Sequence, residues 1–195
     1  MCPHSPAWHE ATANATARRV RTLLQEATLH PEKQRHPRLG ELIPGRLFVG
    51  GVLEAEDEGL LNEYGVTHVV SALGKPPASA LRLKTFYVNA EDDPYYRILD
   101  RHAAEVCEWL DSELTATDAV ALIHCASGVN RSVVLGCAFA VGACKELAAR
   151  APECFMERLA LLLQRLLATR SPVLTNEGFV DQLLAHWPCC APLGN

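Results

Sequence analysis

The most constraining feature of this chain is a buried strand that continues through a short polar loop into an apolar helix. The strand is predicted over residues 119–125, AVALIHC, and the helix over residues 132 to about 144, where nearly every position is apolar. Residues 126–131 connect the two. Because alternating strands and helices cover both faces of a parallel sheet, this succession predicts α/β architecture, with the loop at the carboxyl end of a strand.

The rest of the chain follows the same alternation. Further strands are predicted at residues 46–51, 66–73 and 83–90. Further helices are predicted at residues 6–29, 55–65, 98–114, 153–170 and 176 to about 187. Residues 30–45 contain three prolines and two glycines and are predicted to form a connector. The predicted fold class is therefore α/β, with a largely parallel sheet of four to five strands flanked by helices.

Composition and charge exclude several classes of partner. Hydrophobic residues make up 49% of the 195 residues and charged residues 21%, as in ordinary globular domains. The net charge of −5 argues against nucleic acid or an anionic membrane surface as a partner. Neither a signal peptide nor an apolar stretch of membrane-spanning length is evident. None of the eight cysteines forms a C-x-x-C pair, so we expect no zinc site and a reducing, intracellular compartment.

The loop has the residues of an anion-binding site with a nucleophile at its base. Cys125 ends the strand, Gly128 permits a sharp turn, and Arg131 precedes the helix. If the loop curls, its backbone N–H groups and the amino end of the helix converge where an anion such as phosphate can bind. The same positive potential favours the thiolate form of Cys125, which can attack phosphorus. The alternative, a buried core cysteine, fits poorly with the polar residues around it.

A second Cys-x5-Arg, Cys144 to Arg150 (CKELAAR), shows that the two residues alone are a weak signal. This segment contains no glycine, follows no strand and consists mostly of good helix formers, so it is expected to remain helical. Cys137 and Cys144 lie seven residues apart on one face of the predicted helix. We expect them to pack in the core rather than to act as redox partners of Cys125.

On these residues, the chain resembles the cysteine-based protein tyrosine phosphatases, and in particular their small atypical dual-specificity branch. HCASGVNRS (124–132) is similar to the signature His-Cys-x5-Arg-Ser/Thr of that superfamily. Residues 43–73 are similar to its opening strands, and FYVNAEDDP (86–94) fits its general-acid loop. TNEGFVDQL (175–183) is similar to the start of its last helix. The combination is specific, although each piece alone is not.

The resemblance covers about residues 37–187 and implies both a domain layout and an activity. The implied parts are an N-terminal helical extension and connector (1–36), a catalytic domain (37–188) and a tail (189–195). The implied enzyme hydrolyses phosphotyrosine and phosphoserine or phosphothreonine in proteins through a phosphocysteine intermediate, with no metal and no cofactor. The N-terminal helix is expected to pack on the domain, to mediate a dimer or to bind a docking partner. The expected location is the cytoplasm, with the nucleus as an alternative.

The resemblance also implies a role for each matching residue. Cys125 would attack phosphorus, and Asp92 would protonate the leaving oxygen and then activate water. Ser132 would hydrogen-bond the departing thiolate, and His124 would orient the loop. For Asn176, the residue type and position favour a cap of the last helix over a direct part in catalysis. The implied phosphate-binding residues are Ala126, Ser127, Gly128, Val129, Asn130 and Arg131.

Several alternatives remain open. Asp93 is the alternative general acid to Asp92, while Asn130 and Thr175 depart from the serine and proline common in this branch. A phosphatase-like binding module would hold phosphopeptides without hydrolysing them, although such proteins typically lose the cysteine or the arginine. A phosphatase of phosphoinositides or RNA 5′ ends would carry basic side chains inside the loop, where this chain has neutral ones. A rhodanese-like sulfurtransferase fits the arginine and the acidic loop poorly.

Overall fold

A five-stranded sheet forms the centre of the protein, whose computed structural model describes residues 6–29, 39–75, 82–116, 118–143 and 155–186. The strands are β1 (Gly40–Ile43), β2 (Leu47–Gly50), β3 (His68–Ser71), β4 (Lys84–Tyr87) and β5 (Ala121–His124). Their order in the sheet is β1-β2-β5-β3-β4. Neighbouring strands are parallel except β1 and β2, which are antiparallel. The predicted α/β class with a largely parallel sheet is confirmed.

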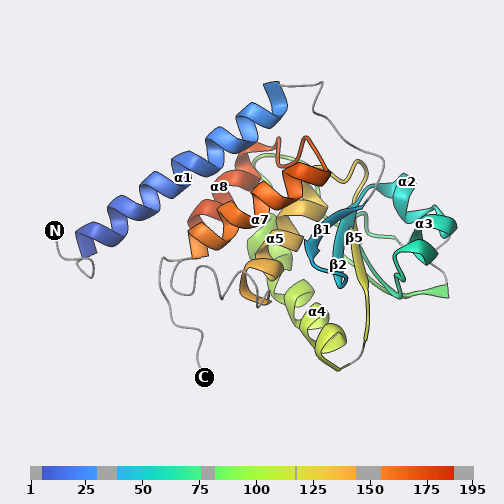
Figure 1. Ribbon diagram of the computed structural model, residues 1–195. Coiled ribbons are helices and arrows are strands. Elements are labelled where there is room, and N and C mark those ends of the chain that lie inside the picture. Colours follow the sequence, from blue (N-terminus) through green and yellow to red (C-terminus); the bar gives the residue numbers. More distant parts are fainter. Residues whose placement is uncertain (1–5, 30–38, 76–81, 117, 144–154, 187–195) are drawn as a thin grey trace.

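Helices cover both faces of the sheet (Figure 1). They are α1 (Pro6–Leu29), α2 (Val52–Ala55), α3 (Glu58–Glu63), α4 (Ala104–Ala116), α5 (Arg131–Ala143), α7 (Phe155–Thr169) and α8 (Glu177–His186). A π-helical turn (Leu99–Ala103) leads into α4, so the helix predicted from residue 98 begins with a wider turn. The short helices α2 and α3 lie on one side of the sheet, and α4, α5, α7 and α8 lie on the other. This arrangement suits a parallel sheet, because both of its faces are apolar.

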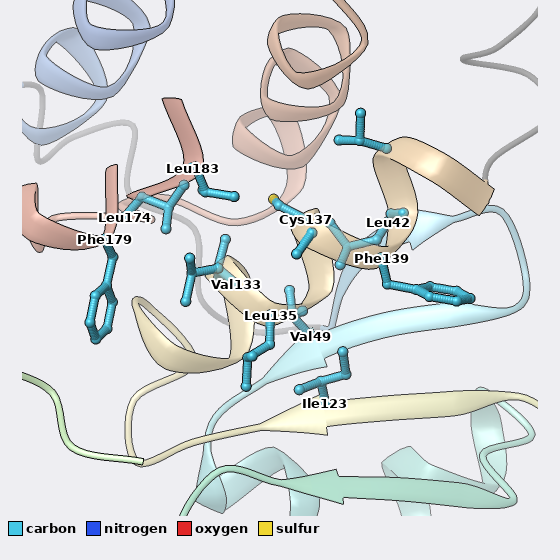
Figure 2. Close-up of a cluster of buried hydrophobic side chains, with 14 of the residues drawn as sticks. Leu42, Val49, Ile123, Val133, Leu135, Cys137, Phe139, Leu174, Phe179 and Leu183 are labelled. Atoms are coloured by element: carbon cyan, nitrogen blue, oxygen red, sulfur yellow. The ribbon is translucent and has the colours of Figure 1, made fainter. Parts of the chain in front are cut away.

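The two faces of the sheet bury separate apolar clusters, because side chains alternate along each strand. On β5, Leu122 belongs to the cluster beside α2 and α3, whereas Ile123 belongs to the cluster beside α5. Figure 2 shows the α5 side, where Leu135 of the helix lies over Val49 and Ile123 of the sheet. Each fully buried aliphatic side chain of this kind contributes about 1.5–3 kcal/mol. This packing holds the start of α5, and therefore the loop before it, against the end of β5.

The structure corrects two of the predicted elements. The connector predicted at residues 30–45 contains β1, because prolines flank Gly40–Ile43 instead of interrupting it and the strand pairs with β2. The helix predicted at residues 55–65 corresponds to α3 alone, and a first short helix, α2, precedes it without having been predicted. Asp57 accepts a hydrogen bond from Leu60 N at 2.9 Å and so caps the start of α3. The other predicted strands and helices are present, with shifted ends.

The N-terminal helix packs on the domain, which is one of the three roles expected for it. Its buried side chains Val20 and Leu24 join the larger apolar cluster, and the helix lies along α7 (Figure 1). Arg21 binds Glu177 Oε2 at 3.1 Å and also pairs with Asp181, so α1 is tied to α8 as well. Exposed ion pairs of this kind each contribute less than about 1 kcal/mol, and the apolar contacts dominate.

Two other predictions concern a membrane-spanning helix and the second Cys-x5-Arg. Across the described ranges, no helix is long and apolar enough to cross a membrane. The second Cys-x5-Arg, Cys144 to Arg150, lies outside the described residues.

Candidate active site

The loop between β5 and α5 lies at the carboxyl end of the central strand, as the sequence predicts. β5 runs parallel between β2 and β3, with His124 opposite Gly50 on one side and Ser71 on the other. The N–H of Cys125 donates to Gly50 O at 3.3 Å, which continues the ladder to the first residue of the loop. The strand and the buried helix α5 therefore hold both ends of the loop at the edge where open α/β sheets bind ligands.

Hydrogen bonds turn the carbonyl groups of the loop outward. The carbonyl oxygens of Ala126, Val129 and Asn130 accept hydrogen bonds from surrounding backbone N–H groups. These donors are Val52, Leu174 and Val134, at 3.1, 2.8 and 2.9 Å respectively. Because the C=O and N–H of one trans peptide point in opposite directions, outward carbonyls direct the following N–H groups inward. The result is a concave ring of N–H groups, hereafter the cradle (residues 125–131), of the kind that binds phosphate.

A buried arginine, Arg170, completes this outward bonding, and the sequence analysis missed it. Its side chain donates from Nε to Gly128 O at 2.9 Å and from Nη2 to Ser127 O at 2.8 Å. Its Nη1 donates to Glu54 Oε1 at 2.8 Å, and the other Glu54 oxygen accepts from Gly51 N at 2.9 Å. Burial pushes the pKa of Glu54 upward, but the hydrogen bond and charge of Arg170 outweigh burial and hold that pKa below its usual value.

Gly128 is required at the tightest point of the cradle. Its φ of 68° lies in the left-handed region, and a Cβ there would overlap Arg170 Nη2 and the backbone of Gly50. We expect Gly128→Ala to lower the free energy of unfolding by about 2–4 kcal/mol in urea denaturation, from backbone strain plus overpacking. Gly45→Ala is the matched control, because Gly45 has a φ of 63° but no atom within 4 Å of its Cβ position. Equal losses in the two variants would contradict the close packing of the cradle.

Cys125 lies at the floor of the cradle. Its side chain is buried, and Sγ accepts a hydrogen bond from Gly128 N at 3.3 Å. The Ser132 hydroxyl is 3.4 Å from Sγ and also 3.4 Å from Gly50 O, so its one proton can go to either acceptor. A thiolate at this position has two donors within reach, and both stabilise its negative charge.

Arg131 and Asp92 face each other at the rim of the cradle. Arg131 Nε lies 3.6 Å from Asp92 Oδ2, and Arg131 Nη1 donates to Ala90 O at 3.2 Å. The guanidinium is therefore held beside the cradle by contacts that leave most of its five N–H donors for other acceptors. A phosphate in the cradle would compete with Asp92 for this guanidinium, because two phosphate oxygens match its planar fork.

Two amide side chains hold the Asp92 carboxylate in place. Asn176 Nδ2 donates to Asp92 Oδ1 at 3.0 Å, and Asn130 Nδ2 donates to Oδ2 at 3.4 Å. Asn130 Oδ1 in turn accepts from Thr175 Oγ1 at 3.2 Å and from Asn176 N at 3.1 Å. The two departures from the dual-specificity pattern, Asn130 and Thr175, therefore contact each other and together fix the acidic loop against the cradle. Asn176 Oδ1 also accepts from the N–H of Phe179 at 3.4 Å, as the helix cap that the sequence suggests.

Asp93, the alternative to Asp92, has a different environment. Its Oδ1 accepts from Tyr95 N at 2.8 Å and its carbonyl accepts from Tyr96 N at 3.0 Å, so it stabilises the turn that follows. Within the described residues, no hydrogen bond joins the Asp93 carboxylate to the cradle. Asp92 is thus the carboxylate that the fold brings to the cradle.

His124 and Cys137 are buried, and Cys107 is partly buried. His124 Nδ1 lies 3.4 Å from Cys125 O, its Nε2 has no hydrogen-bond partner among the described residues, and burial lowers its pKa. Burial raises the pKa of Cys137 to about 12. Burial and the charge of Asp111 raise that of Cys107 to about 11. Both thiols therefore stay protonated near neutral pH, which agrees with the core role predicted for Cys137.

Comparison with known proteins identifies the family. No protein-family model matches the chain. Mouse dual specificity protein phosphatase 13B is 31% identical over 147 residues, which cover 70% of this chain and 67% of that protein. Bovine dual specificity protein phosphatase 26 is 28% identical over an alignment of 216 positions, gaps included, that covers 95% of each chain. Among solved structures, the Yvh1 phosphatase domain from Chaetomium thermophilum matches with a TM-score of 0.61 and 27% identity, over 72% of this chain and 89% of that one.

This chain belongs to the dual-specificity protein phosphatases. The resemblance to the small atypical branch and the predicted class of enzyme, a protein phosphatase, are both confirmed. The alternative of a phosphatase-like binding module is not better supported by these relatives.

Proposed function

We propose that this phosphatase hydrolyses phosphotyrosine and phosphoserine or phosphothreonine in proteins, with Cys125 as nucleophile, Arg131 as phosphate ligand and Asp92 as general acid. The observation that supports this most is the cradle itself. Cys125 Sγ accepts from Gly128 N at 3.3 Å, while the carbonyls of residues 126–130 all bond outward. The inward N–H groups can hold the three terminal oxygens of a phosphate monoester and the charge that develops on them, with phosphorus above the sulfur.

In the first half-reaction, the thiolate of Cys125 attacks phosphorus, so that an S–P bond forms and the bond to the leaving oxygen breaks. Arg131 exchanges its contact with Asp92 for two phosphate oxygens. Asp92, in its protonated form, lies at the rim of the cradle beside the leaving oxygen. That proton passes to the leaving oxygen.

In the second half-reaction, water attacks the phosphocysteine and releases inorganic phosphate. Asp92, now ionised, takes a proton from the water as the O–P bond forms and the S–P bond breaks. The Ser132 hydroxyl, 3.4 Å from Sγ, donates to the sulfur as it becomes a thiolate again. His124 supports the end of β5 as a neutral ring, and Asn176 positions Asp92.

The residues around the cradle support phosphorylated proteins as the substrates. Ala126, Ser127 and Val129 carry no charge, which supports a protein over a highly anionic phosphoinositide or an RNA 5′ end. Ala126 and Ser127 are also exposed, so the cradle lies close to the surface. A shallow site of this kind admits short phosphoserine and phosphothreonine as well as phosphotyrosine.

Partners and location form the rest of the proposal. The outer face of α1 is exposed at Arg18 and Arg19, and a second copy of the chain or a docking partner would bind there. Light scattering of the full chain at micromolar concentration distinguishes a monomer from a dimer.

A catalytic thiol has to stay reduced, which supports an intracellular location, in the cytoplasm with the nucleus as an alternative.

The test of the proposed function is hydrolysis of 4-nitrophenyl phosphate by the full chain in the presence of a metal chelator. Peptides of one sequence that carry phosphotyrosine, phosphoserine or phosphothreonine follow in the same assay. The proposal predicts phosphate release from all of them, with no effect of the chelator. Binding of vanadate without turnover would favour the binding module, and turnover of phosphoinositides or RNA 5′ phosphates alone would overturn the choice of substrate.

Asp92→Asn is expected to lower kcat for a phosphopeptide by about 10²–10⁴-fold, because the leaving oxygen loses its proton donor. The loss should be smaller for 4-nitrophenyl phosphate, whose leaving group needs less help from an acid. Asp93→Asn is the matched control, since an asparagine can still accept the hydrogen bond from Tyr95 N. A larger loss in the Asp93 variant than in the Asp92 variant would reverse the assignment.

A further inference from the structure

An open cleft of about 490 Å³ lies beside the cradle, on the side of α2 and α3. Ala126, Ser127 and Val129 of the cradle line one part of it, and Leu53 and Leu60 line another. Leu53 is 79% exposed, so an apolar surface that no side chain of the described ranges covers stands next to the phosphate site. Because the cleft and the cradle share three residues, a peptide held by its phosphate would pass over the cleft.

The charges in the cleft favour a cation. It contains two carboxylates, Glu54 and Asp57, and one guanidinium, Arg170. Arg170 is 1% exposed and is engaged by Glu54 and by two carbonyls of the cradle, so it cannot meet a ligand. Both Glu54 oxygens accept hydrogen bonds within the protein, from Arg170 and from Gly51 N. One negative charge, that of Asp57, is therefore left to face a ligand.

The Asp57 carboxylate is held in place but still has room for a partner. It is exposed, and its Oδ1 accepts from Leu60 N at 2.9 Å as the cap of α3. A carboxylate has about four acceptor positions, so this bond leaves most of them unused. The cap also fixes the side chain, so that a cation binding there would lose little side-chain freedom on the protein side.

We propose that this cleft binds a lysine or arginine side chain one or two residues from the phosphorylated residue of the substrate. The inference rests on the proposed function and adds a sequence preference to it. The aliphatic stem of the basic residue would lie on Leu53 and Leu60, and its charged end would reach Asp57. Consecutive residues of an extended peptide are about 3.3–3.6 Å apart, which fits a neighbouring site that shares residues with the cradle.

The same charges argue against a second phosphate or an acidic neighbour at this position. The one cation of the cleft, Arg170, is already neutralised by Glu54 at 2.8 Å. An anionic side chain would meet Asp57 and be repelled. The preferred phosphoproteins are therefore basic, not acidic, next to the phosphorylated residue.

Two experiments separate this inference from the proposed function. The first measures binding of three labelled phosphotyrosine peptides, with arginine, alanine or glutamate at the flanking positions, to the full chain carrying Cys125→Ser. The arginine peptide is expected to bind about threefold to tenfold more tightly than the alanine peptide at low salt, and the glutamate peptide more weakly. Adding Asp57→Asn should reduce the ratio between arginine and alanine peptides to about one, while asparagine preserves the cap. The preference should also weaken at high salt.

The control for overall charge is Glu108→Gln on α4, an exposed residue outside the cleft whose replacement removes the same single negative charge. It should leave the ratio unchanged. A ratio that survives Asp57→Asn, or that falls equally with Glu108→Gln, would overturn the cleft as the cause.

The second experiment measures hydrolysis of 4-nitrophenyl phosphate, a substrate without flanking residues, by the parent chain. Absence of hydrolysis would count against the proposed function, whereas the peptide-binding ratios test the cleft whether or not the chain hydrolyses the substrate.

Discussion

Replacement of Cys125 by serine is expected to abolish hydrolysis, with kcat falling by about 10⁴-fold or more. A serine hydroxyl keeps its proton near neutral pH and is a far weaker nucleophile than a thiolate held by the N–H of Gly128 and the hydroxyl of Ser132. The cradle itself should survive, because its carbonyls are fixed by groups outside it, such as Arg170. The variant is therefore expected to bind vanadate or a phosphopeptide while releasing no phosphate.

Cys107→Ser provides the matched control for the loss of a thiol. Cys107 lies on α4, and burial and Asp111 raise its pKa to about 11, so it supplies no thiolate near neutral pH. Its replacement should leave kcat within about twofold of the parent, as expected for a site away from the chemistry. Comparable losses in both variants would mean that a damaged fold, rather than a missing nucleophile, explains the effect at Cys125.

The second large effect is expected at Arg170, on stability. Arg170→Met removes the hydrogen bonds to Glu54, Ser127 and Gly128 and leaves the Glu54 carboxylate without its cation. Breaking a buried ion pair from one side costs about 3–5 kcal/mol, so the free energy of unfolding should fall by that amount in urea denaturation. Phosphate binding should weaken as well, because two carbonyls of the cradle lose the donor that turns them outward.

A double-mutant cycle separates the pair from the rest of the loop. Adding Glu54→Gln to Arg170→Met removes the stranded charge, so the double variant should be more stable than the sum of the two single losses predicts.

The stabilisation that the Glu54–Arg170 pair contributes should also depend on pH. The folded pKa of Glu54 is below its unfolded value, so its contribution is present above the unfolded pKa and is lost as the pH falls through the folded one. Simple additivity, or a difference between parent and Arg170→Met that does not shrink in acid, would contradict the role given to the pair.

The parts of the site that the sequence could predict are those set by neighbouring residues. Cys125, Gly128 and Arg131 follow one another within a single loop, and a strand before the loop with an apolar helix after it leaves few ways to fold. The sheet was predictable for the same reason, since each strand carries its own apolar pattern. β1 was not, because Gly40–Ile43 is short and lies among prolines, and its partner β2 defines it.

The parts that could not be predicted depend on residues far apart in the chain. Arg170 and Glu54 are 116 positions apart, and nothing near either one indicates that they meet beneath the cradle. The local sequence around Arg170 shows no more than an arginine at the end of an apolar helix, a position that is usually solvated. The sequence left the choice between Asp92 and Asp93 open, because two adjacent carboxylates have the same chemistry and differ only in where each side chain points in the folded loop. The bonds from Asn176 and Asn130 show which one turns toward the cradle.

The most direct test of the account is to trap the covalent intermediate. The Asp92→Asn variant lacks the base that activates water, so phosphocysteine should accumulate with 4-nitrophenyl phosphate, whose leaving group needs little acid catalysis. Mass spectrometry of the acid-quenched protein should find one added phosphoryl group, on the peptide that contains Cys125, and none in the Cys125→Ser variant. Turnover with no phosphoryl group on Cys125, or with the group on another residue, would contradict the central claim that this cysteine is the nucleophile.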